Sequence, residues 1–298
     1  MVKSVKLKPF IKWAGGKSQI LEEIQKYYPA ELGKGIKKYA EPFVGGGAVL
    51  FDILSKYSLD SIYISDTNAE LINTYKQIRD NINNLLLILE VYQNEFWELS
   101  TEARKEYYYE KRTVYNALKQ AKILNVEMAA LFIFLNKTCF NGLYRVNKKG
   151  EYNVPMGAYK KPVICDKENL KNISAALAKV KIVCAEYNQS ASFADKYTFA
   201  YFDPPYRPLN ITSSFNSYTE NEFNDNAQIE LALYIQHLSK QGVYVVASNS
   251  DPKNTNAEDN FFDDLYSQMK INRIYASRMI NSNGDSRGKI TELLISSF

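Results

Sequence analysis

Cysteine and histidine are scarce in this sequence. Its 298 residues include three cysteines, Cys139, Cys165 and Cys184, and one histidine, His237. A structural zinc site uses four cysteine or histidine ligands, usually in close pairs. The single histidine and the lack of a cysteine pair at ligand spacing argue against such a site, and we expect no bound metal. The odd number of widely spaced cysteines indicates reduced thiols in a reducing compartment. His237 is interpreted as a structural residue.

Long apolar runs are also absent. The run around 129–135 is far shorter than the ~20 residues of a membrane-spanning helix, and the first residues carry charge without the apolar segment of a secretory signal. We therefore expect a cytoplasmic protein with no membrane partner. The hydrophobic fraction of 46% is too high for a disordered chain and sufficient for a full core.

A strong excess of one charge is missing as well, since the net charge is only +4. The positive charge is nevertheless concentrated. Residues 1–17 contain five lysines and no acidic residue, and residues 119–161 contain eight basic and two acidic residues, a net charge of +6. Each region alone is typical of a solvated surface. Two such regions that also carry motifs favour a surface that follows nucleic-acid phosphates.

The two ends of the chain alternate between strands and helices. Strands are predicted at 36–40 and 61–65, on either side of a glycine-rich loop and a helix at 48–56. Alternation resumes after Pro162, with strands expected at 181–185, 198–202, 243–248, 271–276 and 290–296 and a long helix at 225–240. This alternation predicts an α/β fold with a mainly parallel sheet.

The pattern between these ends is helical over about ninety residues. Thr67 or Asn68 can cap a first helix, and further helices are predicted at 82–92, 102–119 and 126–137. A β-hairpin is predicted at 144–154, with Gly150 in its turn. We therefore expect a catalytic domain of residues 1–68 and 162–298 and an inserted, mainly helical domain of residues 69–161 that carries specificity.

Three glycines, Gly45 to Gly47, lie between a predicted strand and a predicted helix. Glycines here let backbone amides and a helix N-terminus approach a ligand closely, and Asp66 at the end of the next strand can accept hydrogen bonds from both hydroxyls of a ribose. A dinucleotide site would need glycine at position 50, which is leucine. Residues 12–18 end like a P-loop, but the glycine required at position 11 is isoleucine. A plain tight turn is the remaining alternative.

Asp203, Pro204, Pro205 and Tyr206 follow the predicted strand 198–202, at the sheet edge where ligands bind. The prolines restrict the backbone. The Asp203 carboxylate and the Pro204 carbonyl can therefore accept both N–H bonds of an exocyclic amine and direct its lone pair at a methyl donor. Tyr206 can stack on the base, which has to leave a duplex to reach such a pocket. An ordinary turn with a surface tyrosine is the alternative.

Together these motifs resemble the Dam family of DNA adenine methylases. The matching segments are 12–17, 41–47, Asp66, 140–145 and 203–206, in the order of the alpha group of these enzymes and over nearly the whole chain. The resemblance implies a class I methyltransferase (Rossmann-like) sheet, S-adenosylmethionine as methyl donor, S-adenosylhomocysteine as product and double-stranded DNA as substrate. The nearest look-alikes modify adenine N6 in GATC, often in restriction–modification systems, and 69–161 would be the target-recognition domain.

The resemblance also assigns residues to the methyl donor and the target base. Asp203, Pro204 and Tyr206 would be catalytic, with Pro204 and Tyr206 holding the target adenine. Phe43 would pack against the adenine of the donor, and Tyr187 lies in a later segment that matches loosely. The full set of expected donor contacts is Trp13, Lys17, Phe43, Gly45, Gly47, Asp66, Tyr187 and Asp203.

Segment 140–145 matches the recognition loop of the family. Arg145 would donate to O6 and N7 of one guanine, and Lys12 would contact the other. Leu143 would meet a thymine methyl, and Phe140 would enter the base stack beside Asn141. The expected DNA contacts are Lys12, Phe140, Asn141, Leu143, Arg145, Lys148, Lys149, Arg287 and Lys289. The alternatives are core packing for Phe140 and Leu143, a surface ion pair for Arg145, and a plain solvent loop for 286–289.

Other functions remain open on the sequence alone. One is methylation of RNA adenine or of a protein glutamine, although protein glutamine methylases usually carry asparagine where this chain has Asp203. Another is a homologue that binds DNA without catalysis. We expect the protein to be a monomer. The resemblance also allows a partner restriction endonuclease, which would act as a separate protein.

Overall fold

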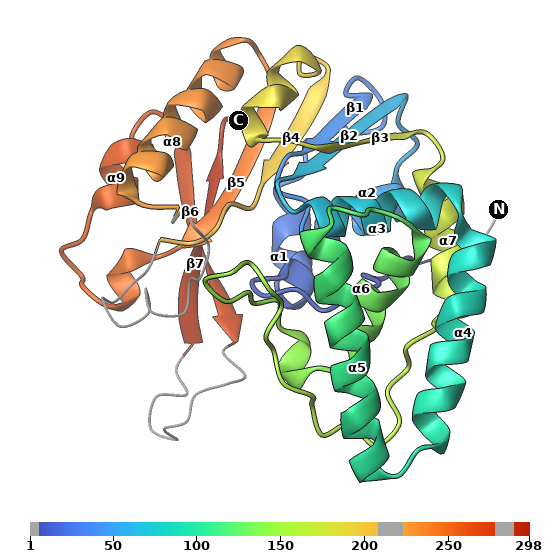
Figure 1. Ribbon diagram of the computed structural model, residues 1–298. Helices are drawn as coiled ribbons and strands as arrows, with labels where there is room; N and C mark the ends of the chain where they lie inside the picture. The colour runs from blue at the N-terminus through green and yellow to red at the C-terminus, as the bar shows by residue number, and fades with distance from the viewer. Residues whose placement is uncertain (1–5, 208–222, 278–288) are drawn as a thin grey trace. The chain divides into compact units, whose positions relative to one another are not determined.

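The computed structural model describes residues 6–207, 223–277 and 289–298 (Figure 1). Its strands form a seven-stranded sheet of order β3-β2-β1-β4-β5-β7-β6. The strands are β1 (Lys38–Glu41), β2 (Ser61–Asp66), β3 (Val180–Cys184), β4 (Thr198–Phe202), β5 (Tyr244–Ser250), β6 (Lys270–Ser277) and β7 (Lys289–Ser296). β1 pairs in parallel with β2 and β4, and β4 with β5, whereas β7 runs antiparallel to β5 and β6. This confirms the expected α/β fold with a class I methyltransferase sheet.

The predicted strand at 198–202 and the predicted helix at 225–240 coincide with β4 and with α8 (Asp225–Lys240). All five residues of β4 are buried, as expected for a strand in the interior of a parallel sheet. Asn224 caps α8, because its side chain accepts a hydrogen bond from the Ala227 amide. The parallel register places the carboxyl ends of β4 and β5 at one edge, with Phe202 opposite Ala247.

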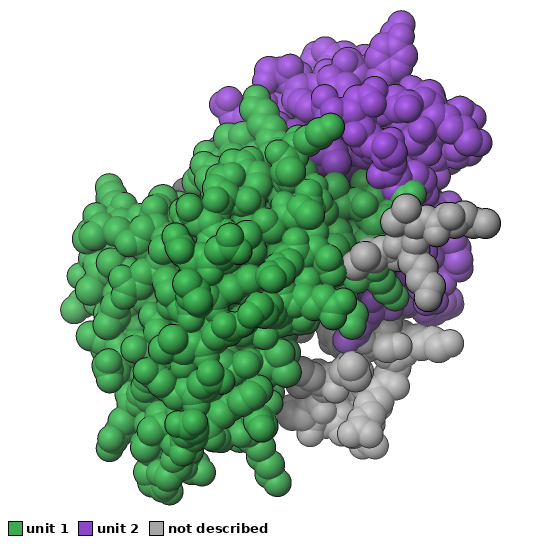
Figure 2. Space-filling model, turned by 90° about the vertical axis from the view of Figure 1, so that its right-hand side faces the viewer, with its two compact units in different colours: residues 1–16, 44–56, 65–185 green, residues 17–43, 57–64, 186–298 purple. Residues whose placement is uncertain are grey.

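The chain folds into two compact units, which Figure 2 distinguishes by colour. Unit 1 consists of Met1–Gly16, Val44–Lys56 and Ser65–Ala185, and unit 2 of Lys17–Phe43, Tyr57–Ile64 and Glu186–Phe298. The helical segment 69–161 lies entirely in unit 1, but this unit also takes in the N-terminal residues, the glycine loop and residues 162–185. The expected boundaries at 68 and 162 therefore do not coincide with the limits of the compact units.

Unit 1 is mainly helical. Its helices are α2 (Ala48–Lys56), α3 (Ala69–Asp80), α4 (Ile82–Glu98), α5 (Thr101–Gln120), α6 (Val126–Thr138) and α7 (Lys167–Leu177). The apolar α6 packs against α3, α4 and α5, which accounts for its burial on all sides. Asn68 caps α3 by accepting from the Leu71 amide, as predicted. Helix α4 extends beyond the predicted end at 92, and α7 was not predicted.

The predicted hairpin at 144–154 is only partly formed. Val146 and Tyr152 form an isolated antiparallel bridge, and the turn contains Gly150 at φ 75°. Asn116 of α5 binds both backbone groups of Tyr152: its Oδ1 accepts from the amide at 2.8 Å and its Nδ2 donates to the carbonyl at 3.1 Å. These two backbone groups are therefore paired with α5 and not with the opposite segment of the hairpin.

Unit 2 has its own hydrophobic core. Helix α8 buries Leu231, Ala232, Ile235 and Leu238 against residues of β4, β5 and β7. The other helices of this unit are the short α1 (Leu21–Gln25) and α9 (Phe261–Leu265). No helix in the described ranges of the chain has both the length and the apolar character needed to cross a membrane. The three cysteines are free thiols; Cys139 and Cys165 are buried and Cys184 is exposed.

Candidate functional site

The glycine loop of unit 1 is shaped around Trp13. Gly45 and Gly47 have φ angles of 46° and 71°, in the region that favours glycine. A Cβ atom on Gly45 would lie 2.8 Å from Cδ1 and Nε1 of the Trp13 indole, and one on Gly46 would lie 3.0 Å from Trp13 Cβ. The loop thus needs glycine both for its backbone conformation and for the close approach of this indole.

Asp66 connects this loop to the start of α3. Its Oδ2 accepts from the Gly45 amide at 3.1 Å and its Oδ1 from the Asn68 amide at 2.9 Å. Burial raises the pKa of the Asp66 carboxyl, and the backbone amides of Asn68, Gly45 and Thr67 oppose that shift. An ionised carboxylate has about four acceptor positions, so Asp66 keeps acceptor capacity for a hydroxyl of a ribose.

In unit 2, Asp203 lies directly after β4 and is held by two donors. Lys17 Nζ is 2.7 Å from Asp203 Oδ1, and Ser248 Oγ donates to the same oxygen at 2.9 Å. Lys17 is 4% exposed, so this ion pair is largely shielded from water. Tyr201 in turn donates to Ser248 Oγ at 3.1 Å. Both contacts of Asp203 use Oδ1, which fixes the plane of the carboxylate.

Tyr206 is fixed at its ring and at its hydroxyl. Lys17 Nζ lies 4.6 Å from the centre of the ring, and the hydroxyl donates to Glu292 Oε2 at 2.6 Å. Burial raises the pKa of Tyr206 well above its usual value, and the negative charges of Asp203 and Glu292 raise it further. The phenol therefore stays neutral, and the ring is a rigid apolar face next to Asp203. Pro204 is buried.

Two further predicted residues of unit 2 form an aromatic pair. The rings of Phe43 and Tyr187 stack with centroids 5.5 Å apart and planes inclined by 24°. Tyr234 of α8 meets Tyr187 edge to face at 5.4 Å. Phe43 and Tyr187 are both half-buried, so part of each ring is available to a planar ligand.

The predicted recognition residues are brought together within unit 1 by Asn136 of α6. Its Oδ1 accepts from the Lys12 amide at 2.9 Å, and its Nδ2 donates to the Lys12 carbonyl at 2.8 Å and to the Gly142 carbonyl at 3.0 Å. A Cβ atom on Gly142 would lie 2.5 Å from Lys12 Cβ. Lys12 and segment 140–145 are thus adjacent, although they are far apart in the sequence.

Most side chains of segment 140–145 are exposed, and Tyr144 is the exception. Phe140 is 52% exposed and Leu143 is 36% exposed, so the core-packing alternative is excluded for both. Asn141 is exposed at φ 55°. Tyr144 points inward and stacks with Trp13, with centroids 5.7 Å apart.

The basic residues near this segment are solvent-exposed. Arg145 Nε donates to Asn153 Oδ1 at 2.7 Å, and among the described residues no acidic group forms an ion pair with Arg145. Lys148 and Lys149 are exposed in the turn that follows. Arg287 lies outside the described residues, and Lys289 is placed only as the first residue of β7.

Three residues of these sites were missed by sequence reasoning. Ser248 ends a buried strand together with two other polar residues, and that position at the carboxyl edge of the sheet is a usable signal. Asn136 is the single amide in the apolar run of α6, which also marks it. Nothing in the local sequence distinguishes Glu292, because its pairing with Tyr206 depends on the fold.

Comparison with known proteins places this geometry in a family. The model of a family described as D12 class N6 adenine-specific DNA methyltransferase matches residues 13–280. The chain is 49% identical to the Type II methyltransferase M.MjaIII of Methanocaldococcus jannaschii, over 99% of this chain and 100% of the relative. It is 37% identical to the Type II methyltransferase M1.LlaDCHI of Lactococcus lactis subsp. cremoris, over 99% and 96%, respectively. It is 32% identical to a DNA adenine methylase of Vibrio cholerae, over 97% and 95%.

Proposed function

We propose that this chain acts on GATC in double-stranded DNA. The proposal starts from its membership of the family of D12 class N6 adenine-specific DNA methyltransferases, which makes it an enzyme that methylates adenine N6 in DNA. The observation that carries the mechanism is the arrangement at Asp203, whose Oδ1 is held by Lys17 and Ser248. The site GATC itself is supported by the resemblance to the Dam family and by relatives named DNA adenine methylase.

The catalytic turn presents acceptors to an amine. With Oδ1 of Asp203 occupied by two donors, we assign Oδ2 and the Pro204 carbonyl to the two N–H bonds of the target adenine. These hydrogen bonds draw the nitrogen lone pair out of conjugation and aim it. The nitrogen then forms a bond to the methyl carbon, and the displaced proton leaves to solvent. Tyr206 supplies the face on which an extruded base stacks.

Two sets of residues, each described within its own unit, fit separate parts of the methyl donor. In unit 1, the glycine loop leaves no room for a side chain beside Trp13, and the Asp66 carboxylate retains acceptor positions for a ribose. In unit 2, Phe43 and Tyr187 offer a half-buried aromatic face for an adenine ring. S-adenosylmethionine supplies a methyl group on a sulfonium, which keeps the bonding pair when the methyl leaves. Lys17, Gly45, Gly47 and Asp203 complete the proposed set.

DNA recognition is assigned to residues 69–161 together with Lys12. Exposed Phe140 would enter the base stack beside Asn141, and Leu143 would contact a thymine methyl. Arg145 and Lys12 would each donate to one guanine. Lys148 and Lys149 would contact phosphates, and Arg287 and Lys289 would contact phosphates or base edges. Relatives named Type II methyltransferases support a role in restriction–modification, and we propose a monomeric enzyme whose partner endonuclease acts separately.

Mapping of methylated positions tests this proposal. Plasmid DNA is incubated with the enzyme and S-adenosylmethionine and sequenced by a method that reads N6-methyladenine; we expect modification of adenine in GATC alone. The Asp203→Ala variant is the control and should leave the plasmid unmodified, because it removes an acceptor for the amine. Methylation at another sequence would refute GATC, and methylation of RNA or peptide in place of DNA would refute the substrate class.

A further inference from the structure

The catalytic turn has one backbone torsion that its prolines do not determine. The rings of Pro204 and Pro205 fix φ at both residues. The ring of Pro205 also restricts ψ of Pro204, because the residue before a proline is limited to extended conformations. The ψ angle of Pro205 is the first torsion after Asp203 that neither ring sets. It orients the Pro205 carbonyl and the start of Tyr206.

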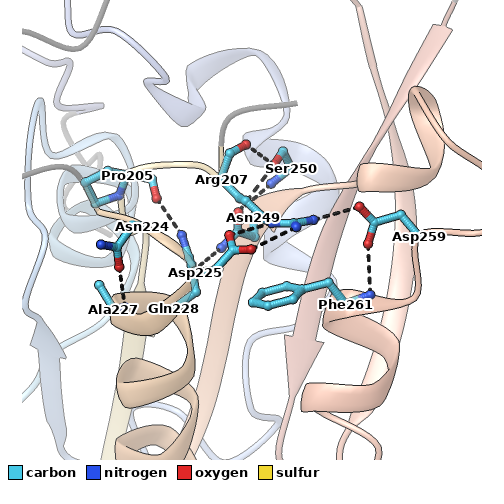
Figure 3. A network of polar contacts seen from close by, with 10 residues as sticks. All are labelled: Pro205, Arg207, Asn224, Asp225, Ala227, Gln228, Asn249, Ser250, Asp259 and Phe261. Atoms are coloured by element: carbon cyan, nitrogen blue, oxygen red, sulfur yellow. Dashed lines mark hydrogen bonds and ion pairs between the residues drawn. The ribbon is translucent and has the colours of Figure 1, made fainter. Parts of the chain in front are cut away.

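Gln228 of α8 holds that carbonyl. Its Nε2 donates to the Pro205 oxygen at 2.9 Å, as Figure 3 shows. Gln228 is fully buried, at 0% exposure, so its side-chain amide depends on partners within the protein for its hydrogen bonds. A hydrogen bond on the carbonyl of Pro205 fixes the torsion that the two rings leave free.

Asn249 at the end of β5 determines which way the Gln228 amide points. The Ser250 amide, which can only donate, lies 2.9 Å from Asn249 Oδ1. Asn249 Nδ2 therefore faces Gln228 Oε1, at 3.0 Å, and Gln228 is left with its NH2 group toward Pro205, whose carbonyl can only accept. The Ser250 amide at one end can only donate, and the Pro205 carbonyl at the other end can only accept. Both ends therefore agree on one orientation for the Asn249 amide and one for the Gln228 amide.

The other side of Tyr206 is held as well. Ser250 Oγ donates to the Arg207 carbonyl at 3.2 Å. The Arg207 guanidinium binds Asp225 through Nε at 2.7 Å and Nη2 at 3.0 Å, and Asp259 through Nη1 at 2.7 Å (Figure 3). It also lies 4.3 Å from the ring centre of Phe261. Tyr206 thus lies between two carbonyls that are both hydrogen-bonded.

We propose that Gln228, oriented by Asn249, is a positioning residue that sets the place of Tyr206 through the Pro205 carbonyl. This inference rests on the proposed role of Tyr206 in holding the target adenine. Gln228 itself acts through the turn and does not contact the base. Loss of its hydrogen bond frees the Pro205 torsion, so the stacking face moves relative to the oxygens that hold the amine.

The test compares Gln228→Leu with Gln236→Leu. Gln236 is on the same helix and donates to a backbone carbonyl, that of Leu265, at 2.8 Å, but it does not contact the catalytic turn. For each full-length variant, the single-turnover rate of methyl transfer is measured at saturating DNA and S-adenosylmethionine, with the melting temperature. We expect a rate loss of ~10- to 100-fold for Gln228→Leu, as for a small misplacement of reacting groups, and a rate near wild type for Gln236→Leu.

Gln228→Glu supplies a second readout that does not depend on stability. A protonated glutamic acid can donate to the Pro205 carbonyl while its other oxygen accepts from Asn249, whereas the ionised form has no proton to donate. Burial raises the pKa of such a carboxyl and brings its protonation into the assay range. We therefore expect the rate of Gln228→Glu relative to wild type to rise as the pH falls.

Several outcomes would overturn the inference. These are a wild-type rate for Gln228→Leu, equal losses for the two leucine variants, and a ratio for Gln228→Glu that does not change with pH. If Gln228→Leu does not fold, the pH dependence of the rate of Gln228→Glu relative to wild type decides alone.

Tyr206→Ala is measured in parallel. A wild-type rate for Tyr206→Ala refutes the role proposed for Tyr206. A reduced rate for Tyr206→Ala together with a wild-type rate for Gln228→Leu refutes only the role of Gln228.

Discussion

Arg145 is exposed, and its guanidinium donates from Nε to a neutral amide oxygen, Asn153 Oδ1. Asn153 thus orients the side chain without neutralising its charge. We expect Arg145→Ala to weaken binding of a GATC duplex by ~1–3 kcal/mol and to reduce discrimination at one guanine. The measurement is the dissociation constant for GATC and for duplexes with each base pair replaced in turn, at one salt concentration.

Arg145→Lys is the matched control for this prediction. Lysine keeps the charge but lacks the planar fork that binds O6 and N7 together, so it should retain overall affinity better than discrimination. An equal loss on every duplex for Arg145→Ala would show that Arg145 contacts phosphate instead of a base.

Single residues differ in how far the sequence could identify them. Asp203 and Tyr206 were predicted as a pair because a rigid motif after a buried strand is a local signal. The pairing of Lys17 with Asp203 and of Tyr206 with Glu292 was not predictable, because each joins segments that only the folded sheet brings together. Gln228 is read from sequence as an ordinary helix residue, and its role follows only from its contact with Pro205.

At the scale of secondary structure, a strong period in the apolar residues predicted the bounds of helices and strands reliably. β4, α2 and α8 have the predicted bounds, because each has a complete apolar face and clear ends. The hairpin at 144–154 was overestimated: Val146 and Tyr152 form an isolated bridge, and alternation along the chain does not predict how far a ladder extends beyond one bridge. Helix α7 was missed although Asp166 caps it by accepting from the Asn169 amide.

The turn that carries Lys148 and Lys149 is the element expected to follow the DNA backbone. Both side chains are exposed, and neither is proposed to contact a base. We expect Lys148→Ala combined with Lys149→Ala to weaken binding of all duplexes to a similar degree. Each lost phosphate contact should also reduce the slope of log K against log salt by about 0.9.

Titration of duplex binding between low and moderate salt measures this slope. Lys122→Ala combined with Lys160→Ala is the control, since both lysines lie in the same basic stretch and are exposed but are outside the turn. A change in discrimination between duplexes, with an unchanged salt slope, would contradict the assignment to phosphate.

At the scale of the whole molecule, the sequence predicted one inserted domain, whereas packing divides the chain into two units that each draw on several segments. The pattern along the chain shows where the helices begin, but not that α3 packs against α7 and β3. Those contacts join residues 162–185 to the helical segment.

Binding of S-adenosylhomocysteine should stabilise the folded protein. At a ligand concentration of 100 Kd the free energy of unfolding rises by about 2.7 kcal/mol. For a chain of 298 residues this corresponds to a rise in melting temperature of roughly 4 °C. Differential scanning fluorimetry measures the shift, and NAD is the control because the loop lacks the third glycine of a dinucleotide site. A shift with NAD and none with S-adenosylhomocysteine would refute the cofactor assignment.

The hydrogen bonds of Asn136 bear on how the DNA target sequence of such an enzyme changes in evolution. One buried amide satisfies three main-chain groups of two distant segments, so the path of the recognition loop does not depend on the outward side chains at positions 140, 141 and 143. Under the proposed assignment of these positions to DNA bases, they can diverge by single codon changes while the backbone scaffold is inherited intact. We expect such changes to alter the target sequence without loss of a folded intermediate.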